Sequence, residues 1–325
     1  MENRDPSVSV IIPAFNSSGT IRRALDSVLV QTRPPEQIIV VDDGSTDGTA
    51  VIVSEYGGRI DYFWQPNAGV GAARNFGIRE AKNPWIAFLD ADDEWLPDHL
   101  FRQVEILRAH PDLVWITGNC LRRDSQGRNS PAFCSADKSL RSDRASFFTA
   151  FTQNCWGCTD TMLIRREVFE QVGEFRTEFK TTDIDMWFRI AFQFPEIGIV
   201  YEPLAVYYLD TPDSIIKSRL QDVEVLIQFL RRNLRLAQDH GKAAEFQPCA
   251  SLMLRKWIRG LLFAGQGRQA KGFANEFGSM LPLYCRILVW IGSLFPGLTA
   301  SGLRLVSRLA RGMGLRNSAT RTPST

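Results

Sequence analysis

Three acids within four residues form the densest chemical group in this 325-residue sequence. Asp90, Asp92 and Asp93 directly follow the apolar run 85–89. Carboxylates this close repel one another, so a buried strand that ends in them usually holds a cation that offsets their charge. The alternative is a solvated acidic turn before a helix, since Asp is common at helix starts and 97–98 reads as Pro-Asp.

A second acidic strand end favours the metal site. Asp42 and Asp43 follow the apolar run 38–41, about 50 residues earlier. In open α/β sheets, ligands bind at the carboxyl ends of the strands, where both acid groups would lie. Hard oxygen ligands suit Mg²⁺ or Mn²⁺. The two strand ends therefore predict one metal-containing site at a sheet edge.

Alternating strands and helices must position these acids. The pattern predicts an α/β fold with a mostly parallel, Rossmann-like central sheet and helices on both faces. The predicted strands are 8–13, 38–41, 60–64, 85–89, 113–117, 161–164, 198–201 and 204–209, and the predicted helices are 19–31, 47–56, 70–81, 97–110, 166–172 and one that begins near 182.

Four segments, taken in order, resemble the family 2 glycosyltransferases of the A-type fold. They are 13–16 (PAFN), 42–45 (DDGS), 67–75 (NAGVGAARN) and 90–93 (DADD), the last containing a DxD motif. The resemblance runs from residue 8 to about 209. It implies an inverting, metal-dependent transferase that moves one sugar from a nucleoside diphosphate sugar, with uridine diphosphate as the family default.

The resemblance also implies roles for individual residues. Asp92 is the expected metal ligand, while Asp90 holds the ribose or the water shell of the ion. The Phe15 ring offers a face for a base, Asp43 an acceptor for a base N–H, and Arg74 a positive charge near phosphate or donor sugar. Asp93 is expected only to cap a helix. The predicted nucleotide-sugar residues are Pro13, Phe15, Asp43, Gly71, Arg74, Asp90 and Asp92.

The segment 182–189 (TDIDMWFR) matches the part of the family that carries the catalytic base. Asp183 falls on the base position, although Thr182 replaces the usual Glu. Without the resemblance, Asp183 would be interpreted as a helix cap. Asp185 is assigned to the acceptor side, where it is expected to tie its helix to nearby loops. Trp156 either stacks on an acceptor sugar or belongs to the core.

A second departure from the family lies at Asp210, where many relatives have a His near the metal or diphosphate. Asp210 is therefore a further candidate metal ligand, and an acid there predicts a stronger dependence on metal. The three histidines, His99, His110 and His240, are expected to be surface residues.

The charge of the chain is divided unevenly. After residue 250 there are 11 Lys and Arg against one acid. The run 280–295 is too apolar for a nucleic-acid arm and too short for a membrane span, and 303–316 is basic and amphipathic. We expect a catalytic domain at 1–212, a helical region at 213–316 that contacts an anionic membrane surface or forms a homodimer, and a disordered tail at 317–325. No nucleic-acid partner is expected.

The expected location is the cytoplasm, peripherally on the inner face of the cell membrane, because residues 1–7 form no secretory signal and six cysteines show no disulfide framework. The expected acceptor is a lipid-linked glycan or polysaccharide of the cell envelope. Two alternatives stay open. A nucleotidyltransferase should carry a Gly-rich, basic segment after the first strand, and a non-catalytic sugar-nucleotide-binding scaffold should have lost some of Asp43, Asp92 and Asp183.

Overall fold

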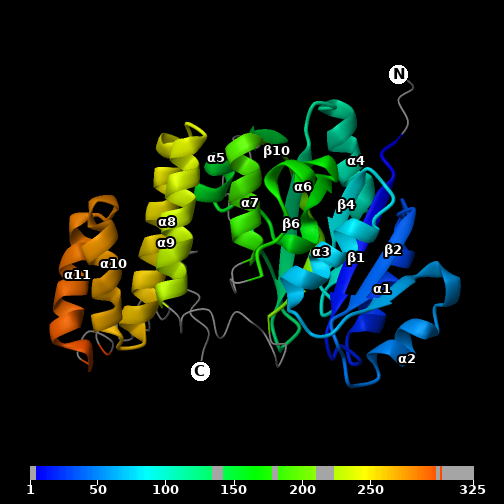
Figure 1. The fold of residues 1–325 in the computed structure, drawn as a ribbon, viewed down its shortest axis with the longest axis horizontal. Coiled ribbons are helices and arrows are strands. Elements are labelled where there is room, and N and C mark those ends of the chain that lie inside the picture. Colours follow the sequence, from blue (N-terminus) through cyan, green and yellow to red (C-terminus); the bar gives the residue numbers. More distant parts are fainter. Residues whose placement is uncertain (1–4, 134–141, 178–181, 210–222, 298–300, 302–325) are drawn as a thin grey trace. The chain divides into compact units, whose positions relative to one another are not determined.

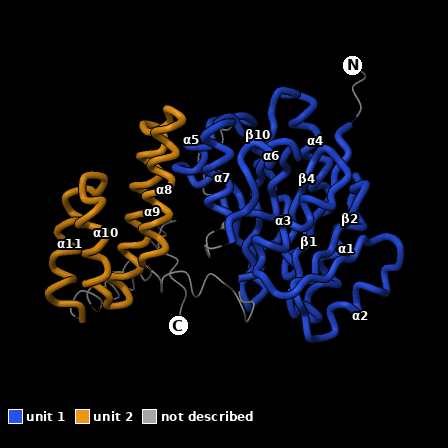
Figure 2. The backbone as a smooth tube through the Cα atoms, viewed as in Figure 1, with its two compact units in different colours: residues 1–214 blue, residues 215–325 orange. Residues whose placement is uncertain are grey.

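The computed structural model describes residues 5–133, 142–177, 182–209, 223–297 and 301. The chain forms two compact units, residues 1–214 and 215–325 (Figure 2). The predicted domain boundary after residue 212, the amphipathic segment 303–316 and the tail 317–325 lie outside the described residues.

The first unit is built on a ten-stranded mixed sheet with the order β3-β2-β1-β4-β9-β6-β10-β5. Its first half, β3 to β4, is parallel throughout. Strand β9 runs antiparallel to both β4 and β6, and β10 runs parallel to β6. The strands are β1 (Val8–Ala14), β2 (Gln37–Asp42), β3 (Asp61–Trp64), β4 (Trp85–Phe88), β5 (Glu94–Trp95), β6 (Trp115–Arg123), β7 (Asn129–Pro131), β8 (Arg144–Ser146), β9 (Leu163–Arg165) and β10 (Glu196–Tyr208).

Every residue of β1, β2 and β4 is buried, which explains why these strands read as unbroken apolar runs. The predicted α/β class, with helices on both faces of the sheet, is confirmed (Figure 1). One difference is that the predicted strands 198–201 and 204–209 form a single strand, β10, whose pairing with β6 shifts register between Val200 and Ala205.

Apart from α5, which was not predicted, the helices of this unit lie where the sequence predicted them. Helix α3 packs on β1 and β2, and a Cβ at Gly77 would lie 2.5 Å from the Ile11 side chain, so this glycine lets helix and sheet approach. The helices are α1 (Ile21–Leu29), α2 (Thr49–Ser54), α3 (Val70–Glu80), α4 (His99–Ala109), α5 (Phe147–Thr152), α6 (Glu167–Val172) and α7 (Thr182–Gln193), with 3-10 turns η1 (Gly57–Arg59) and η3 (Thr159–Thr161).

The second unit is helical, with α8 (Val223–Asp239), α9 (Ala243–Phe263), α10 (Gly267–Phe277), η5 (Gly278–Met280) and α11 (Leu283–Leu294). Trp257 packs between Phe229 and Phe273, with ring centroids 6.0 Å apart in both pairs. Among the described residues, no helix is both long and apolar enough to cross a membrane.

Candidate donor-binding and catalytic site

The loops that follow β1 and β2 are tied together at the edge of the sheet. The Asn16 side chain accepts a hydrogen bond from the Thr46 N–H at 2.8 Å, and the Asn16 N–H donates to the Ser45 hydroxyl at 2.9 Å. Pro13 is buried within β1, whereas Phe15 is 51% exposed. The backbone around Phe15 is therefore anchored, while the Phe15 ring is accessible, as stacking on a nucleotide base requires.

Asp43 is a buried acceptor that organises the segment before α3. Its carboxylate accepts hydrogen bonds from the N–H groups of Ala68 at 2.9 Å and Gly69 at 2.8 Å, and from the Gln65 side chain at 2.6 Å. A carboxylate offers about four acceptor positions, so roughly one is left for a base N–H. Gly44 has φ +83°, and a Cβ there would lie 2.8 Å from the Asn67 nitrogen, so only glycine fits this close approach.

Asp42, the second acid of this strand end, is also engaged by the protein. It accepts hydrogen bonds from the Ser45 N–H and the Tyr62 hydroxyl, both at 2.7 Å. Burial and the nearby Asp42 raise the pKa of Tyr62. Asp42 therefore shapes its own loop, and the structure gives it no separate role toward a ligand.

Arg74 lies on α3, where Gly71 is buried as well. Its Nη2 donates to Asp90 Oδ1 at 2.6 Å. Burial works to lower the pKa of Arg74, but the charges of Asp90 and Asp183 outweigh it and the pKa is raised. The Nε of Arg74 is buried and has no hydrogen-bond partner among the described residues. A permanently charged guanidinium thus pairs with an acid of the DxD motif and is stabilised by the charge of the predicted catalytic base.

The acid loop, residues 90–93, is held by groups from distant parts of the chain. Asp90 and Asp92 are partly exposed, and the Arg23 guanidinium donates to the Asp92 carbonyl. Asp93 is fully buried and accepts a hydrogen bond from the Tyr208 N–H at 2.8 Å. The expectation that Asp93 caps a helix is wrong, because α4 begins only at His99.

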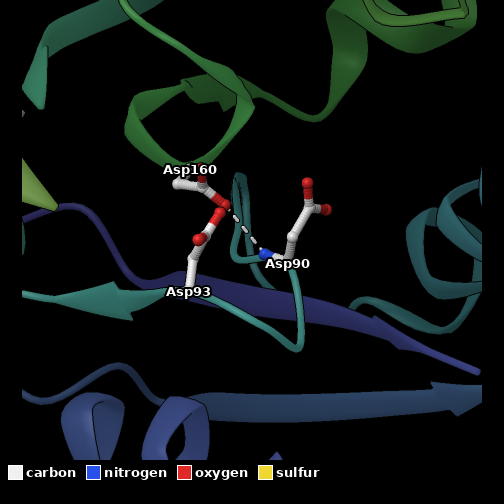
Figure 3. A group of neighbouring side chains, drawn as sticks. All are labelled: Asp90, Asp93 and Asp160. Atoms are coloured by element: carbon white, nitrogen blue, oxygen red, sulfur yellow. Dashed lines mark hydrogen bonds between the residues drawn. The ribbon is translucent and has the colours of Figure 1, made fainter. Parts of the chain in front are cut away.

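Asp160 is a site residue that sequence reasoning missed. Its Oδ1 accepts a hydrogen bond from the Asp90 N–H at 2.8 Å, and its carboxyl group faces that of Asp93 (Figure 3). Burial and the charge of Asp90 raise the pKa of Asp160 to about 7, while burial and the charge of Asp160 raise that of Asp93 well above its usual range. The available signal was a lone acid directly before the apolar strand 161–164, within a region without clear periodicity.

Carboxylates of Asp90, Asp93 and Asp160 offer oxygens that all lie within 4.8 Å of one another. Asp93 Oδ2 is buried without a hydrogen-bond partner among the described residues, so the group carries uncompensated acceptor capacity. A set of only oxygen donors fits a hard divalent cation. This set contains Asp90 but has Asp93 and Asp160 where the sequence predicted Asp92. The third predicted ligand, Asp210, lies outside the described residues.

Asp183 is half-buried in the first turn of α7. Two residues away, Asp185 is fully buried in ion pairs with Arg189 at 2.8 Å and Arg176 at 3.2 Å. Arg189 also donates to the carbonyls of Val172 and Glu174. Asp185 therefore fixes the start of α7, as expected of a residue that ties its helix to nearby loops.

The 173–176 segment links α7 to α3. Asn75 and Phe175 exchange two hydrogen bonds, from Asn75 Nδ2 at 2.8 Å and from the Phe175 N–H at 2.7 Å. The guanidinium of Arg74 lies 5.6 Å from the Phe175 ring centroid. These contacts explain how Asp183, more than 100 residues along the chain, comes under the charge of Arg74.

The predictions for Trp156 and His99 have different outcomes. Trp156 is half-buried and stacks on Phe151 with ring centroids 5.2 Å apart, so one part of it packs in the core and another is accessible. His99 was expected at the surface, and that is wrong. It is fully buried, stacks on Trp95 and hydrogen-bonds the Leu204 carbonyl through Nδ1 at 3.0 Å.

Comparisons with known proteins agree with this geometry. The sequence model of glycosyl transferase family 2 matches residues 9–173, about half of the chain. A protein of Rickettsia typhi named as an uncharacterized glycosyltransferase is 34% identical over 67% of this chain and 65% of its own length. TuaG of Bacillus subtilis, a putative teichuronic acid biosynthesis glycosyltransferase, is 35% identical over 54% of this chain and 68% of its own length. The solved structure of S. aureus TarS 1-349 in complex with UDP-GlcNAc has the same fold, with a TM-score of 0.70 and 18% identity over 92% of both chains.

Proposed function

The chain belongs to glycosyl transferase family 2, and on that premise we propose that it is an inverting, metal-dependent glycosyltransferase that moves a single sugar from a nucleoside diphosphate sugar to a lipid-linked or polysaccharide acceptor. The observation that carries this proposal is the position of Arg74. One buried guanidinium pairs with Asp90 on the donor side and interacts with the charge of Asp183 on the acceptor side.

The proposed division of labour follows from this placement. Phe15 stacks on the base, and the remaining acceptor position of Asp43 takes a base N–H. Arg74 places positive charge beside the diphosphate, where negative charge grows as the glycosidic bond breaks. Asp183 takes the proton of the acceptor hydroxyl as that oxygen attacks the face opposite the leaving group.

The acid loop would hold the metal, with Asp92 and Asp90 as the proposed ligands. A divalent cation bound there would supply further positive charge for the departing diphosphate. Asp93 and Asp160 are buried, and Asp160 accepts the hydrogen bond from the Asp90 N–H, so we assign to these two acids the role of holding the loop in shape. Asp210 stays a proposed further ligand.

The names of relatives support a choice of donor and of acceptor. TuaG is named for teichuronic acid biosynthesis, and TarS was solved with UDP-GlcNAc. We therefore propose a UDP-sugar donor, a cell-envelope or exopolysaccharide product, and work at the cytoplasmic face of the membrane. The chain spans less than two thirds of the length of the Rickettsia relative.

The decisive experiment is a screen of nucleotide sugars for hydrolysis in the presence of Mn²⁺, repeated with acceptor glycans. At the metal concentration that is just sufficient for the wild type, Asp92→Asn should abolish hydrolysis of the donor, while Asp183→Asn should lose transfer to the acceptor more than donor binding. Glu105→Gln, an exposed acid on α4, is the matched control and should leave both unchanged. Hydrolysis that is unaffected by Asp92→Asn would sink the site assignment, and donor binding without turnover would favour the scaffold alternative.

A further inference from the structure

Helix α11 presents a broad apolar surface to its surroundings. At about 100° per residue, the exposed apolar side chains fill a continuous arc of roughly 160°. They are Leu283, Tyr284, Ile287, Leu288, Trp290, Ile291, Leu294 and, just after the helix, Phe295, with exposed fractions from 36% to 68%. Soluble proteins rarely leave so continuous an apolar patch to water, and such patches mark contact surfaces.

The opposite side of α11 is packed firmly within its unit. Cys285, Val289 and Gly292 are buried, and α11 packs against α10. A Cβ at Gly267 of α10 would lie 1.9 Å from the Gly292 carbonyl oxygen, so the two helix backbones meet without intervening side chains. The apolar arc is therefore the outer surface of a helix whose orientation in the unit is set.

The charge of this region identifies the kind of partner. From residue 251 onward the sequence carries 11 Lys and Arg and one acid, Glu276, which forms a two-pronged pair with Arg231. Arg268 and Lys271 on α10 and Arg286 on α11 are exposed. Six of these 11 basic residues belong to the described part of the region, and against one acid they give it an excess of positive charge that repels a second copy of itself and attracts an anionic lipid surface.

A cavity of about 310 Å³ lies beside the apolar arc. Its lining includes Gln266, Arg268, Gln269 and Ser293, together with Leu294 from the arc itself. A cation and several hydrogen-bond donors next to an apolar side chain suit a lipid phosphate head group whose acyl chains lie along the helix. The cavity thus favours a lipid over an apolar protein surface.

We propose that the outer face of α11 lies in the plane of an anionic membrane, with Trp290 and Leu294 inserted at the boundary of head groups and acyl chains and Arg268 at a lipid phosphate. The helix of 12 residues is about 18 Å long, against about 30 Å for the hydrocarbon core, so it lies on the bilayer. This inference deepens the proposed function. Only the purpose of the membrane contact rests on that function, since the contact would bring the enzyme to a membrane-held acceptor.

The test is flotation of the full chain with vesicles of phosphatidylcholine alone or mixed with phosphatidylglycerol. Wild type should bind the mixed vesicles, less so as salt is raised. The double variant Trp290→Asp/Leu294→Asp should lose at least tenfold in binding, and Arg268→Gln should weaken binding only on the anionic vesicles. Val51→Asp is the matched control, since Val51 is an exposed apolar residue of α2 in the other unit. Inorganic phosphate should not compete if the site needs a lipid.

Three results would overturn the inference. If the wild-type protein does not bind the anionic vesicles, the inference is wrong. A dimer in light scattering that the double variant dissociates would assign the face to a second copy. Shielding of Trp290 from a soluble quencher before vesicles are added, read as wild type minus Trp290→Phe, would show that the chain covers its own face. Donor hydrolysis without vesicles should be unchanged in all these variants, so failure here is distinguishable from failure of the proposed enzyme activity.

Discussion

The Asp160 carboxylate holds the backbone of Asp90 through a 2.8 Å hydrogen bond from the Asp90 N–H. The Asp160 carbonyl also accepts a hydrogen bond from the Trp95 indole at 2.8 Å. One residue of the short turn η3 thus holds both the first residue of the acid loop and the strand β5 that follows the loop. Metal and donor would therefore meet carboxylates whose backbone is already in place.

Replacing Asp160 separates its geometric role from its charge. Asp160→Asn keeps an oxygen for the Asp90 N–H and offers an amide donor to Asp93, so we expect folding and donor turnover close to wild type. Asp160→Leu leaves the Asp90 N–H without its acceptor and should cost about 1–3 kcal/mol of unfolding free energy and raise the metal concentration needed for half-maximal turnover. Denaturant titration and metal titration measure these effects, and a Leu variant that equals Asn would contradict the positioning role.

Loss of Arg74 should cost both stability and activity. Arg74→Gln leaves the partly exposed Asp90 without its buried partner, so we expect about 2–3 kcal/mol less unfolding free energy and a fall in turnover of about a hundredfold. Arg79→Gln is the control on the same helix, because Arg79 forms only an exposed pair with Glu174 and should cost at most about 1 kcal/mol. Equal effects of the two variants would remove Arg74 from the site.

Metal removal tests the acid loop without a mutation. Chelation should abolish donor hydrolysis, and added Mn²⁺ or Mg²⁺ should restore it, since the crowded carboxylates otherwise repel the diphosphate. Asp92→Asn should raise the metal concentration required by at least about tenfold. Calorimetric titration of the donor with and without metal gives the direct measurement, and unchanged donor binding after chelation would count against the metal proposal.

His99 should make the protein sensitive to mild acid. Burial lowers the pKa of His99 to about 3, whereas an unfolded His titrates near 6.5. Below pH 6.5, His99 therefore binds a proton in the unfolded state but not in the folded state. The stability that comes from neutral His99 is fully present above pH 6.5 and is lost as the pH falls toward 3. Between pH 7 and pH 5, wild type should lose about 2 kcal/mol more unfolding free energy than His99→Asn. Taking the difference between the two proteins cancels the opposite titration of Asp93 and Asp160, and parallel pH profiles would contradict the prediction.

The regular elements were predictable because their patterns are local. A few neighbouring residues are enough to predict these elements, as the apolar runs of β1, β2 and β4 and the glycines at the start of α3 show. The acids at the ends of β2 and β4 were predictable as neighbours because parallel strands end at one sheet edge. Phe15 and Asp43 gained roles only through the order of segments that resembles a family.

The site residues missed by the sequence are those that depend on distant pairing. Asp160 reaches the acid loop only because β9 inserts antiparallel between β4 and β6, and no local signal specifies that register. His99 lies on an amphipathic helix whose inward face could not be told from its outward face at that position. The sequence predicted that Asp93 caps a helix because it does not show which residues become buried. The burial of Asp93 depends on the assembly of the whole unit.

The three-residue strand β9 joins the two halves of the sheet. During synthesis, strands β1 to β4 can pair soon after they emerge, yet they carry an acid loop that lacks its support. Asp160 arrives about 70 residues after Asp90, just ahead of β9. A nascent chain that ends before β9 would therefore expose clustered like charges with no fixed arrangement, and completion of the donor site would coincide with the slow, long-range closure of the sheet.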